Sequence, residues 1–324
     1  MKDIDLTSII SLEQDDAQKW YALEKERDEV LKLQAKLFKL NYQSYSYSLS
    51  YESINFTSEK EALVTLFESH DVIFEGSAPE VSKMANLKHN ITLRKTGKGW
   101  GIVNDNYNDD RLPSIKNFAE KEAAKSNIQN HFQATNKDLL SSSPLSVATL
   151  TTYTNHSYNR SGAVTYADHW WNARSVFYYN FSPNDCTNYV SQAMHDSTGA
   201  GIVYDTTGNL HWYYNGYSDY STSWTVVQDF WYNMTHTDGS DATGPYGIEY
   251  SGVCSGVAAG DIIQINQYGS YDHAGIIVSV GSPCSDNTKT LLDAHDTDRY
   301  HYPISNWSSF PWRFIHIQGW YSAN

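Results

Sequence analysis

The chain has 324 residues, of which 40% are hydrophobic and 19% charged, a composition typical of a globular protein long enough for two domains. Its formal net charge of −14 argues against nucleic-acid binding, and no apolar run approaches the ~20 residues that a membrane-spanning helix needs. The opening residues, MKDIDLTSII, lack the apolar core of a signal peptide, so we expect that any export signal is absent from this chain.

The two parts of the chain differ in composition. Residues 1–150 hold 18 Lys/Arg and 22 Asp/Glu, whereas residues 151–324 hold 5 and 15, together with eight of the ten tryptophans. This contrast predicts an accessory domain at 1–112, a helix and a Ser/Thr-rich linker at 113–156, and a second domain at 157–324. Surfaces poor in lysine and rich in aromatic residues are common in secreted proteins, so we expect an extracellular or cell-wall-associated location.

The first unit is predicted to begin with a helix and to continue as an antiparallel sheet. Apolar residues recur at three-, four- and seven-residue spacing from Leu23 to Leu40, which indicates a packed helix. Tyrosine and leucine alternate with serine in 45–51, which predicts a half-buried strand. Further strands are expected at 62–67, 71–76, 90–95 and 100–105. This order is similar to the α+β folds of NTF2-like or cystatin-like domains.

No catalytic group of residues is predicted in this first unit. The aspartates of 104–110 lack the glycine and the distal glutamate of a calcium loop. We therefore expect the chemistry of the protein to lie in its second half.

The three cysteines have different surroundings. Cys254 and Cys284 lie in turn-like segments that flank the same two predicted strands, so we expect a disulfide between them. Cys186 follows a Pro-Asn-Asp turn and precedes an apolar helical pattern, which places it in the first turn of a helix. A helix start favours the thiolate and offers free N–H groups to an oxyanion, although a lone cysteine is more often a small core residue.

Two histidines accompany this cysteine. His273 opens the second strand of a predicted hairpin, and His295 lies on the next predicted strand, TLLDAHD. Histidines on neighbouring antiparallel strands can lie side by side, which would give a nucleophile, a base and an orienting group. Zinc bound by His273, His295, Asp296 and Cys186 is the alternative, but the sequence has no CxxC or HExxH motif, so no metal is expected.

These segments carry a resemblance to a known family. The runs NDCTNYVSQ, GDIIQ, YDHAGIIV and AHDTD resemble the bacterial "putative amidase" domain family, which is similar to the NlpC-type and CHAP cysteine peptidases of the papain-like superfamily. The resemblance covers about residues 157–322 and implies an α+β, papain-like domain whose cysteine-bearing helix packs on an antiparallel sheet. It implies Cys186 as nucleophile and His273 as general base, with His295 or Asp296 as the third polar residue, and no cofactor.

Further residues match or flank the family's motif. Asp185, Asn188 and Gln192 match it around the nucleophile. We expect Asp185 to cap the helix, and Asn188 and Gln192 either to line the cleft as oxyanion or substrate contacts or to pack behind it. Trp171 and Trp224 are candidates for cleft walls that hold the substrate, with ordinary packing as the alternative.

The function expected from these features is that of a cysteine amidase or peptidase. Its partner would be a peptide or cell-wall substrate, with neither nucleic acid nor integral membrane association. Two alternatives stay open: a catalytically silent binding or scaffold protein of papain-like fold, and a thiol acyltransferase of the transglutaminase type. Hydrolysis and transfer share an acyl-enzyme, so the sequence does not separate them.

Overall fold

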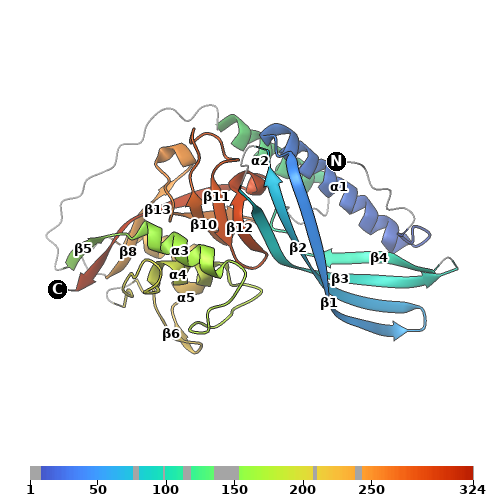
Figure 1. Cartoon of the computed structure of the whole chain (residues 1–324), viewed down its shortest axis with the longest axis horizontal. Coiled ribbons are helices and arrows are strands. Elements are labelled where there is room, and N and C mark those ends of the chain that lie inside the picture. The colour runs from blue at the N-terminus through green and yellow to red at the C-terminus, as the bar shows by residue number, and fades with distance from the viewer. Residues whose placement is uncertain are drawn as a thin grey trace.

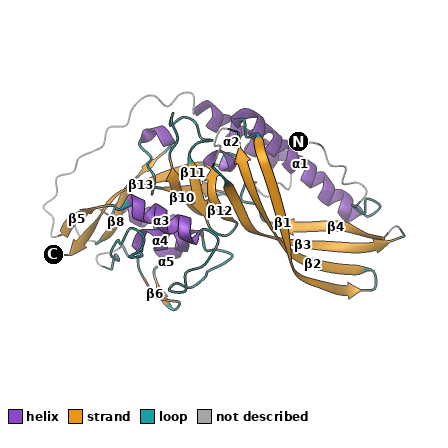
Figure 2. Ribbon diagram, viewed as in Figure 1, coloured by secondary structure: helices purple, strands orange, loops and turns teal. Residues whose placement is uncertain are grey.

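An 11-stranded antiparallel sheet runs through both halves of the molecule (Figure 1). The computed structural model describes residues 9–75, 80–97, 99–111, 118–134, 153–206, 210–237 and 243–323. Helices lie on both sides of the sheet (Figure 2), so the predicted mixed α+β class with an antiparallel sheet is confirmed.

The strands of the large sheet lie in the order β1-β2-β3-β12-β11-β10-β9-β13-β5, with β4 also paired to β3 and β8 to β13. A separate two-stranded sheet holds β6 and β7. The strands of both sheets have the bounds β1 Tyr42–Ser58, β2 Glu61–Phe74, β3 Ser82–Thr96, β4 Gly99–Tyr107, β5 Tyr153–Ser157, β6 Tyr214–Gly216, β7 Asp219–Tyr220, β8 Gly244–Tyr250, β9 Ile262–Asn266, β10 Tyr271–Ser279, β11 Leu291–Ala294, β12 Asp298–Pro303 and β13 Trp312–Ala323.

The helices of the described residues are short except for the first two. Their bounds are α1 Asp15–Phe38, α2 Phe118–Ala134, α3 Arg160–Trp170, α4 Cys186–His195, α5 Thr222–Thr225 and α6 Val227–His236, with 3₁₀ turns η2 Val253–Ser255 and η3 Ile304–Trp307. In the described ranges, we find no helix with the combination of length and apolar character that crossing a membrane requires.

Strand β1 differs from its prediction. The alternation in 45–51 predicted a half-buried strand, but β1 is longer and all its residues are exposed except the partly buried Ser53. The reason is that α1 packs over β4 and against η3, and no described element covers β1 on either face. The alternation therefore predicted a strand correctly, but no element among the described residues covers the face of β1 that it predicted to be buried.

Strand β2 joins two segments that were predicted to be separate strands. The predicted 62–67 and 71–76 strands are continuous in β2, and the pairing with β3 shifts register between Glu68 and His70. This irregularity explains why the alternation changes phase there. The strands predicted at 90–95 and 100–105 lie in β3 and β4, which pair as a hairpin with Thr96 opposite Gly99.

The two halves share both the sheet and a core. Strand β3 pairs with β12, with Met84 opposite Arg299. Val30 and Phe38 of α1 pack in the same apolar cluster as Ile277 of β10 and its neighbours. Strand pairing thus crosses the predicted boundary between the two units. Most of the predicted linker, 135–152, lies outside the described residues, and the division into domains stays a prediction.

Strand β10 is covered on both faces. Helix α4 packs on one face, where Val190 and Met194 join Ile276 in an apolar cluster. The opposite face packs against the cluster that contains Trp307. Fully burying an aliphatic side chain contributes about 1.5–3 kcal/mol, so this double covering fixes α4 firmly over β10. Two residues on these elements, Cys186 and His273, are thereby held face to face.

Candidate active site

Cys186 is the first residue of α4 and is only 4% exposed. Cys254 and Cys284 form a disulfide with their Cα atoms 5.2 Å apart, which leaves Cys186 as the free thiol. The first N–H groups of a helix have no partner within the helix, so the thiol lies beside donors that suit an anion. The helix start predicted from the sequence is confirmed.

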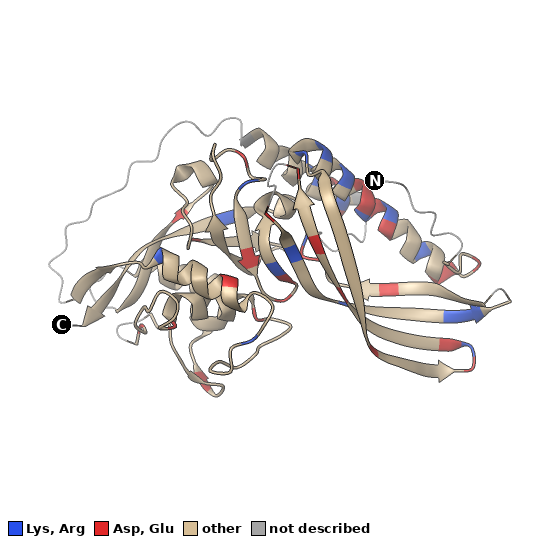
Figure 3. Ribbon diagram, viewed as in Figure 1, with Lys and Arg blue, Asp and Glu red and all other residues tan. Residues whose placement is uncertain are grey.

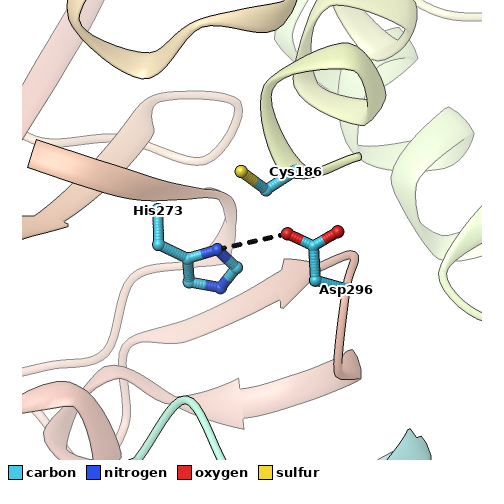
Figure 4. A group of neighbouring side chains, drawn as sticks. All are labelled: Cys186, His273 and Asp296. Carbon is cyan, nitrogen blue, oxygen red and sulfur yellow. Dashed lines mark ion pairs between the residues drawn. The ribbon is translucent and has the colours of Figure 1, made fainter. Parts of the chain in front are cut away.

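His273 and Asp296 face this thiol (Figure 4). A ring nitrogen of His273, an Asp296 carboxylate oxygen and Cys186 Sγ all lie within 4.8 Å of one another. His273 Nδ1 is 3.7 Å from Asp296 Oδ2. Asp296 follows β11 with a φ of 91°, a left-handed conformation that few residues other than glycine adopt. That turn directs its carboxylate at the histidine.

A second carboxylate lies at the other nitrogen of the same ring. Asp110 Oδ2 is 3.6 Å from His273 Nε2, and Asp110 lies in the segment that follows β4. Arg299 Nε donates to Asp110 at 3.0 Å and Trp307 Nε1 donates at 3.2 Å. Asp110 is thus fixed in place by buried donors while it faces the imidazole.

The charges around the ring determine its protonation. Burial lowers the pKa of His273, but contact with Asp110 and with Cys186 outweighs burial and raises that pKa well above its usual value. Burial raises the pKa of Asp110, but Arg299 and His273 hold it below its usual value. Burial also raises the pKa of Asp296, a shift that His273 opposes. The imidazole is therefore stabilised as a cation beside the thiol.

Asp110 was missed by sequence reasoning, which expected no site residue in the first half. The partner that positions it, Arg299, lies 189 residues away in the sequence. The local signal that could have drawn attention to it is the charged run Asp109–Arg111, which is separated from the end of β4 by one residue. That run has no motif spacing, so only the fold connects it to His273.

His295 does not lie beside His273 as predicted. It follows the end of β11, where the strand pairing has ended, and its side chain turns toward α3 and α4. Its Nδ1 lies 2.7 Å from Asp185 Oδ2 and its Nε2 lies 2.8 Å from the Trp170 carbonyl. Both ring nitrogens are thus occupied away from the thiol, so His295 supports the start of α4.

Asp185 supports the site differently from the predicted helix cap. Its side chain makes no capping bond. Instead its Oδ1 accepts from Phe181 N and from Asn188 Nδ2, while its backbone N–H donates to Asp296 Oδ1 at 2.6 Å. Asp185 therefore links the turn before α4 to Asp296.

The other predicted contacts pack behind α4 or, in the case of Trp171, against β12. Asn188 is buried and bonds to Asp185, the Tyr179 carbonyl and the Trp224 indole. Gln192 accepts from Tyr166, and Trp224 is fully buried in the core. Trp171 contacts the ring of Tyr300. Neither amide faces the thiol through its hydrogen bonds, so the packing alternative fits Asn188 and Gln192.

The thiol, imidazole and carboxylate are also groups that can act as ligands to a metal ion. Cys186, His273 and Asp296 are close enough to ligate one ion together. His295, which the sequence grouped with them, is absent from that set because both its nitrogens face other partners.

Comparison with known proteins connects this geometry to a family. A model of the family described as "Putative amidase domain" matches residues 157–318, half of the chain. The "Uncharacterized protein YhbB" of Bacillus subtilis (strain 168) is 41% identical over 70 residues, which are 22% of this chain. The same match spans 22% of the length of that relative.

Among solved structures, the crystal structure of the Kfla4162 protein from Kribbella flavida aligns with a TM-score of 0.19 and 9% identity. That alignment covers 22% of this chain and 49% of the other. The family match includes Cys186, His273 and Asp296 but excludes Asp110. The chain belongs to the "putative amidase domain" family.

Proposed function

We propose that this protein is a cysteine amidase or peptidase that uses Cys186 as its nucleophile and His273 as its acid and base. The observation that carries the proposal is the free Cys186 thiol at the start of α4, within 4.8 Å of both His273 and Asp296. A thiol, a base and groups that hold the base form the arrangement on which thiol hydrolases depend.

The first half of the reaction forms an acyl-enzyme. Cys186 Sγ, with its proton on His273, attacks the carbonyl carbon of the substrate amide, and free N–H groups of the first turn of α4 stabilise the oxyanion. His273 then gives its proton to the leaving amine, the C–N bond breaks, and a thioester remains on Cys186.

The second half regenerates the enzyme. His273, now neutral, takes a proton from a water molecule that attacks the thioester, and the carboxylic acid leaves as the thiolate reforms. We assign Asp110 as the orienting group. It faces His273 Nε2, whereas Nδ1 is the nitrogen on the side of Asp296 and the thiol (Figure 4). The 3.6 Å separation is long for a hydrogen bond, and such contacts tighten when substrate binds.

The substrate we propose is a cell-wall peptide or a similar extracellular amide. The family match supports amide hydrolysis, and the lysine-poor, aromatic-rich second half supports an exported protein. The acidic net charge disfavours anionic wall polymers, so a neutral or cationic peptide stem suits the enzyme better.

The decisive experiment compares wild type with Cys186→Ala and His273→Ala on wall muropeptides and simple peptide amides. We expect each substitution to lower kcat/KM at least about 1,000-fold while the circular dichroism spectrum is unchanged. His195→Gln is the matched control, because His195 lies on the same helix but contacts the Ile202 carbonyl. Wild-type-like activity in either site variant would reject the assignment.

Analysis of the reaction products, together with the rate of Cys186 alkylation, separates the alternatives. Added amine that appears in the product would assign the transglutaminase type of reaction. No turnover, together with slow Cys186 alkylation that is unaffected by His273→Ala, would leave the binding or scaffold protein as the better interpretation.

A further inference from the structure

We propose that Asp168, Asp293 and His301 form a binding site for a divalent transition-metal cation, separate from Cys186 and its partners. The three residues come from α3, β11 and β12, and one donor atom from each lies within 4.8 Å of the others. The cluster shares no residue with the proposed catalytic group.

His301 is held as a metal-binding histidine usually is. Its Nε2 lies 2.8 Å from Asp168 Oδ1, while its Nδ1 faces the carboxylate of Glu80. Histidine ligands generally bind metal through one nitrogen and donate the other N–H to a carboxylate, which fixes the ring and strengthens the ligand. Ser82 Oγ donates to the His301 carbonyl at 2.7 Å and holds the backbone at this point. Glu80 is therefore the supporting carboxylate, and Nε2 is the ligand.

Asp293 supplies the observation that calls for a cation. Its side chain is 0% exposed, and its Oδ1 accepts from the His301 backbone N–H at 2.6 Å. Its Oδ2 is buried and has no hydrogen-bond partner among the described residues. A buried carboxylate oxygen without a donor is costly, and the neighbouring negative charge of Asp168 adds to that cost. A cation held between the two carboxylates and Nε2 removes both penalties.

The donor set indicates the kind of cation. One imidazole nitrogen and two carboxylate oxygens suit Zn²⁺ or Mn²⁺ better than Ca²⁺, which prefers oxygen ligands alone. Bonds of about 2.0 Å in a tetrahedron place ligand atoms ~3.3 Å apart, so Asp168 and His301 need to separate by only about 0.5 Å. The Asp168 side chain is 36% exposed, which gives the ion a route from solvent and leaves room for a water ligand.

Such an ion would connect parts of the chain that are far apart. It would fasten α3 to β11 and β12, and through Glu80 it would engage the segment that precedes β3 in the first half. We therefore expect binding to stabilise the junction of the two halves.

The test measures Zn²⁺ and Mn²⁺ binding to the full chain by equilibrium dialysis with elemental analysis. Cys186→Ala is the background, because it removes the thiolate from the other possible set of ligands. We expect about one Zn²⁺ per chain, and at least a 100-fold weaker Kd after Asp293→Asn. Glu80→Gln should weaken binding about 10- to 100-fold, as expected for a supporting carboxylate. Asp219→Asn, an exposed aspartate of β7, is the matched control and should leave Kd unchanged.

Each outcome decides the proposal. A Cys186→Ala protein that binds neither ion at about 100 µM would overturn it, as would binding that is indifferent to Asp293→Asn, Asp168→Asn and Glu80→Gln. The cluster would then be an ion-pair network in which Asp168 and Asp293 share one proton and keep a single negative charge beside His301. Should Asp293→Asn fail to fold, Glu80→Gln and Asp168→Asn give the same answer.

Discussion

Strands β1 and β10 belong to one sheet but have opposite surroundings. Apart from Ser53, every residue of β1 is exposed, whereas β10 is buried from His273 to Val278 between α4 and the cluster around Trp307. The candidate site occurs only where the sheet is covered on both faces. Covering excludes water and fixes side chains in place, which a thiol and an imidazole need in order to act together.

The two halves of the chain also differ in how many charged residues they carry. Lysine, arginine and acidic residues are frequent on α1, whereas the second half carries few (Figure 3). Several charges of the second half are instead buried in pairs, such as Arg299 with Asp110 of the first half. The first half thus contributes to the site through one short segment, and the predictions below test how far the two regions depend on one another.

The largest expected effect contrasts a buried with an exposed strand position. Ile276 of β10 is 0% exposed and Tyr47 of β1 is 66% exposed. Ile276→Ala should lower the free energy of unfolding by about 4 kcal/mol, because it removes transfer energy and leaves a cavity. Tyr47→Ala should change it by less than about 0.5 kcal/mol. Urea denaturation of both variants measures the difference, and a large loss for Tyr47→Ala would mean that β1 is covered in solution.

The next effect tests whether the first half supplies a group to the reaction. Asp110→Asn should lower kcat/KM about 100-fold, which is about 2.7 kcal/mol, because His273 loses the carboxylate that orients it. Asp110 also raises the pKa of His273, so the alkaline limb of the pH–rate profile should move to lower pH. The profile is measured from about pH 5 to 10 with the best amide substrate.

Asp109→Asn is the matched control for this prediction. Asp109 shares Arg299 with Asp110 but pairs otherwise with Arg111 and has no contact with His273. Equal rate losses in the two variants with an unchanged pH profile would show that Asp110 only supports the fold, and Asp296 would then be the orienting group.

A smaller effect concerns the packing of α2 on the second half. His131 Nε2 lies 2.7 Å from the Phe310 carbonyl, and its ring packs on Trp312. Burial lowers the pKa of His131 from 6.5 to about 4, so the unfolded chain binds the extra proton first as pH falls. Stability should therefore decrease from about pH 6.5 toward pH 4, and this histidine should contribute about 2 kcal/mol of that loss between pH 7.5 and 5.

His131→Gln keeps a donor for the Phe310 carbonyl and cannot titrate. The difference in unfolding free energy between wild type and this variant, measured by denaturation at each pH, isolates the contribution of His131. A difference that does not change with pH would contradict the buried, neutral histidine.

Local chemistry was predictable from the sequence, and long-range placement was not. The turn, the cap position and the apolar pattern placed Cys186 at a helix start, because these signals lie within ten residues of one another. The hairpin that carries His273 was equally local, and the pairing of β9 with β10 bears it out. By contrast, Asp110 reaches His273 only through the β3–β12 pairing and the Arg299 contact. No spacing within the sequence encodes that approach.

The misplacement of His295 has a similar physical cause. The sequence treated TLLDAHD as one strand, but β11 ends at Ala294 and the chain turns through Asp296. Because the strand ends two residues earlier than predicted, the side chains that follow it leave the alternation, so His295 faces α3 and α4 while Asp296 faces the thiol. Strand ends are set by tertiary pairing, which the alternation alone does not contain.

The smallest effect tests this difference between the two histidines. His295→Gln should lower the free energy of unfolding by about 1.5 kcal/mol, because one of the bonds to Asp185 and the Trp170 carbonyl is lost. It should lower kcat/KM less than about tenfold, because His295 contacts the support of α4 and not the reacting atoms. A loss as large as that of His273→Ala, with the fold intact, would restore His295 as the group that orients the base. The site would then rearrange on substrate binding, since in the structure its two ring nitrogens are held on the other side of the turn before α4.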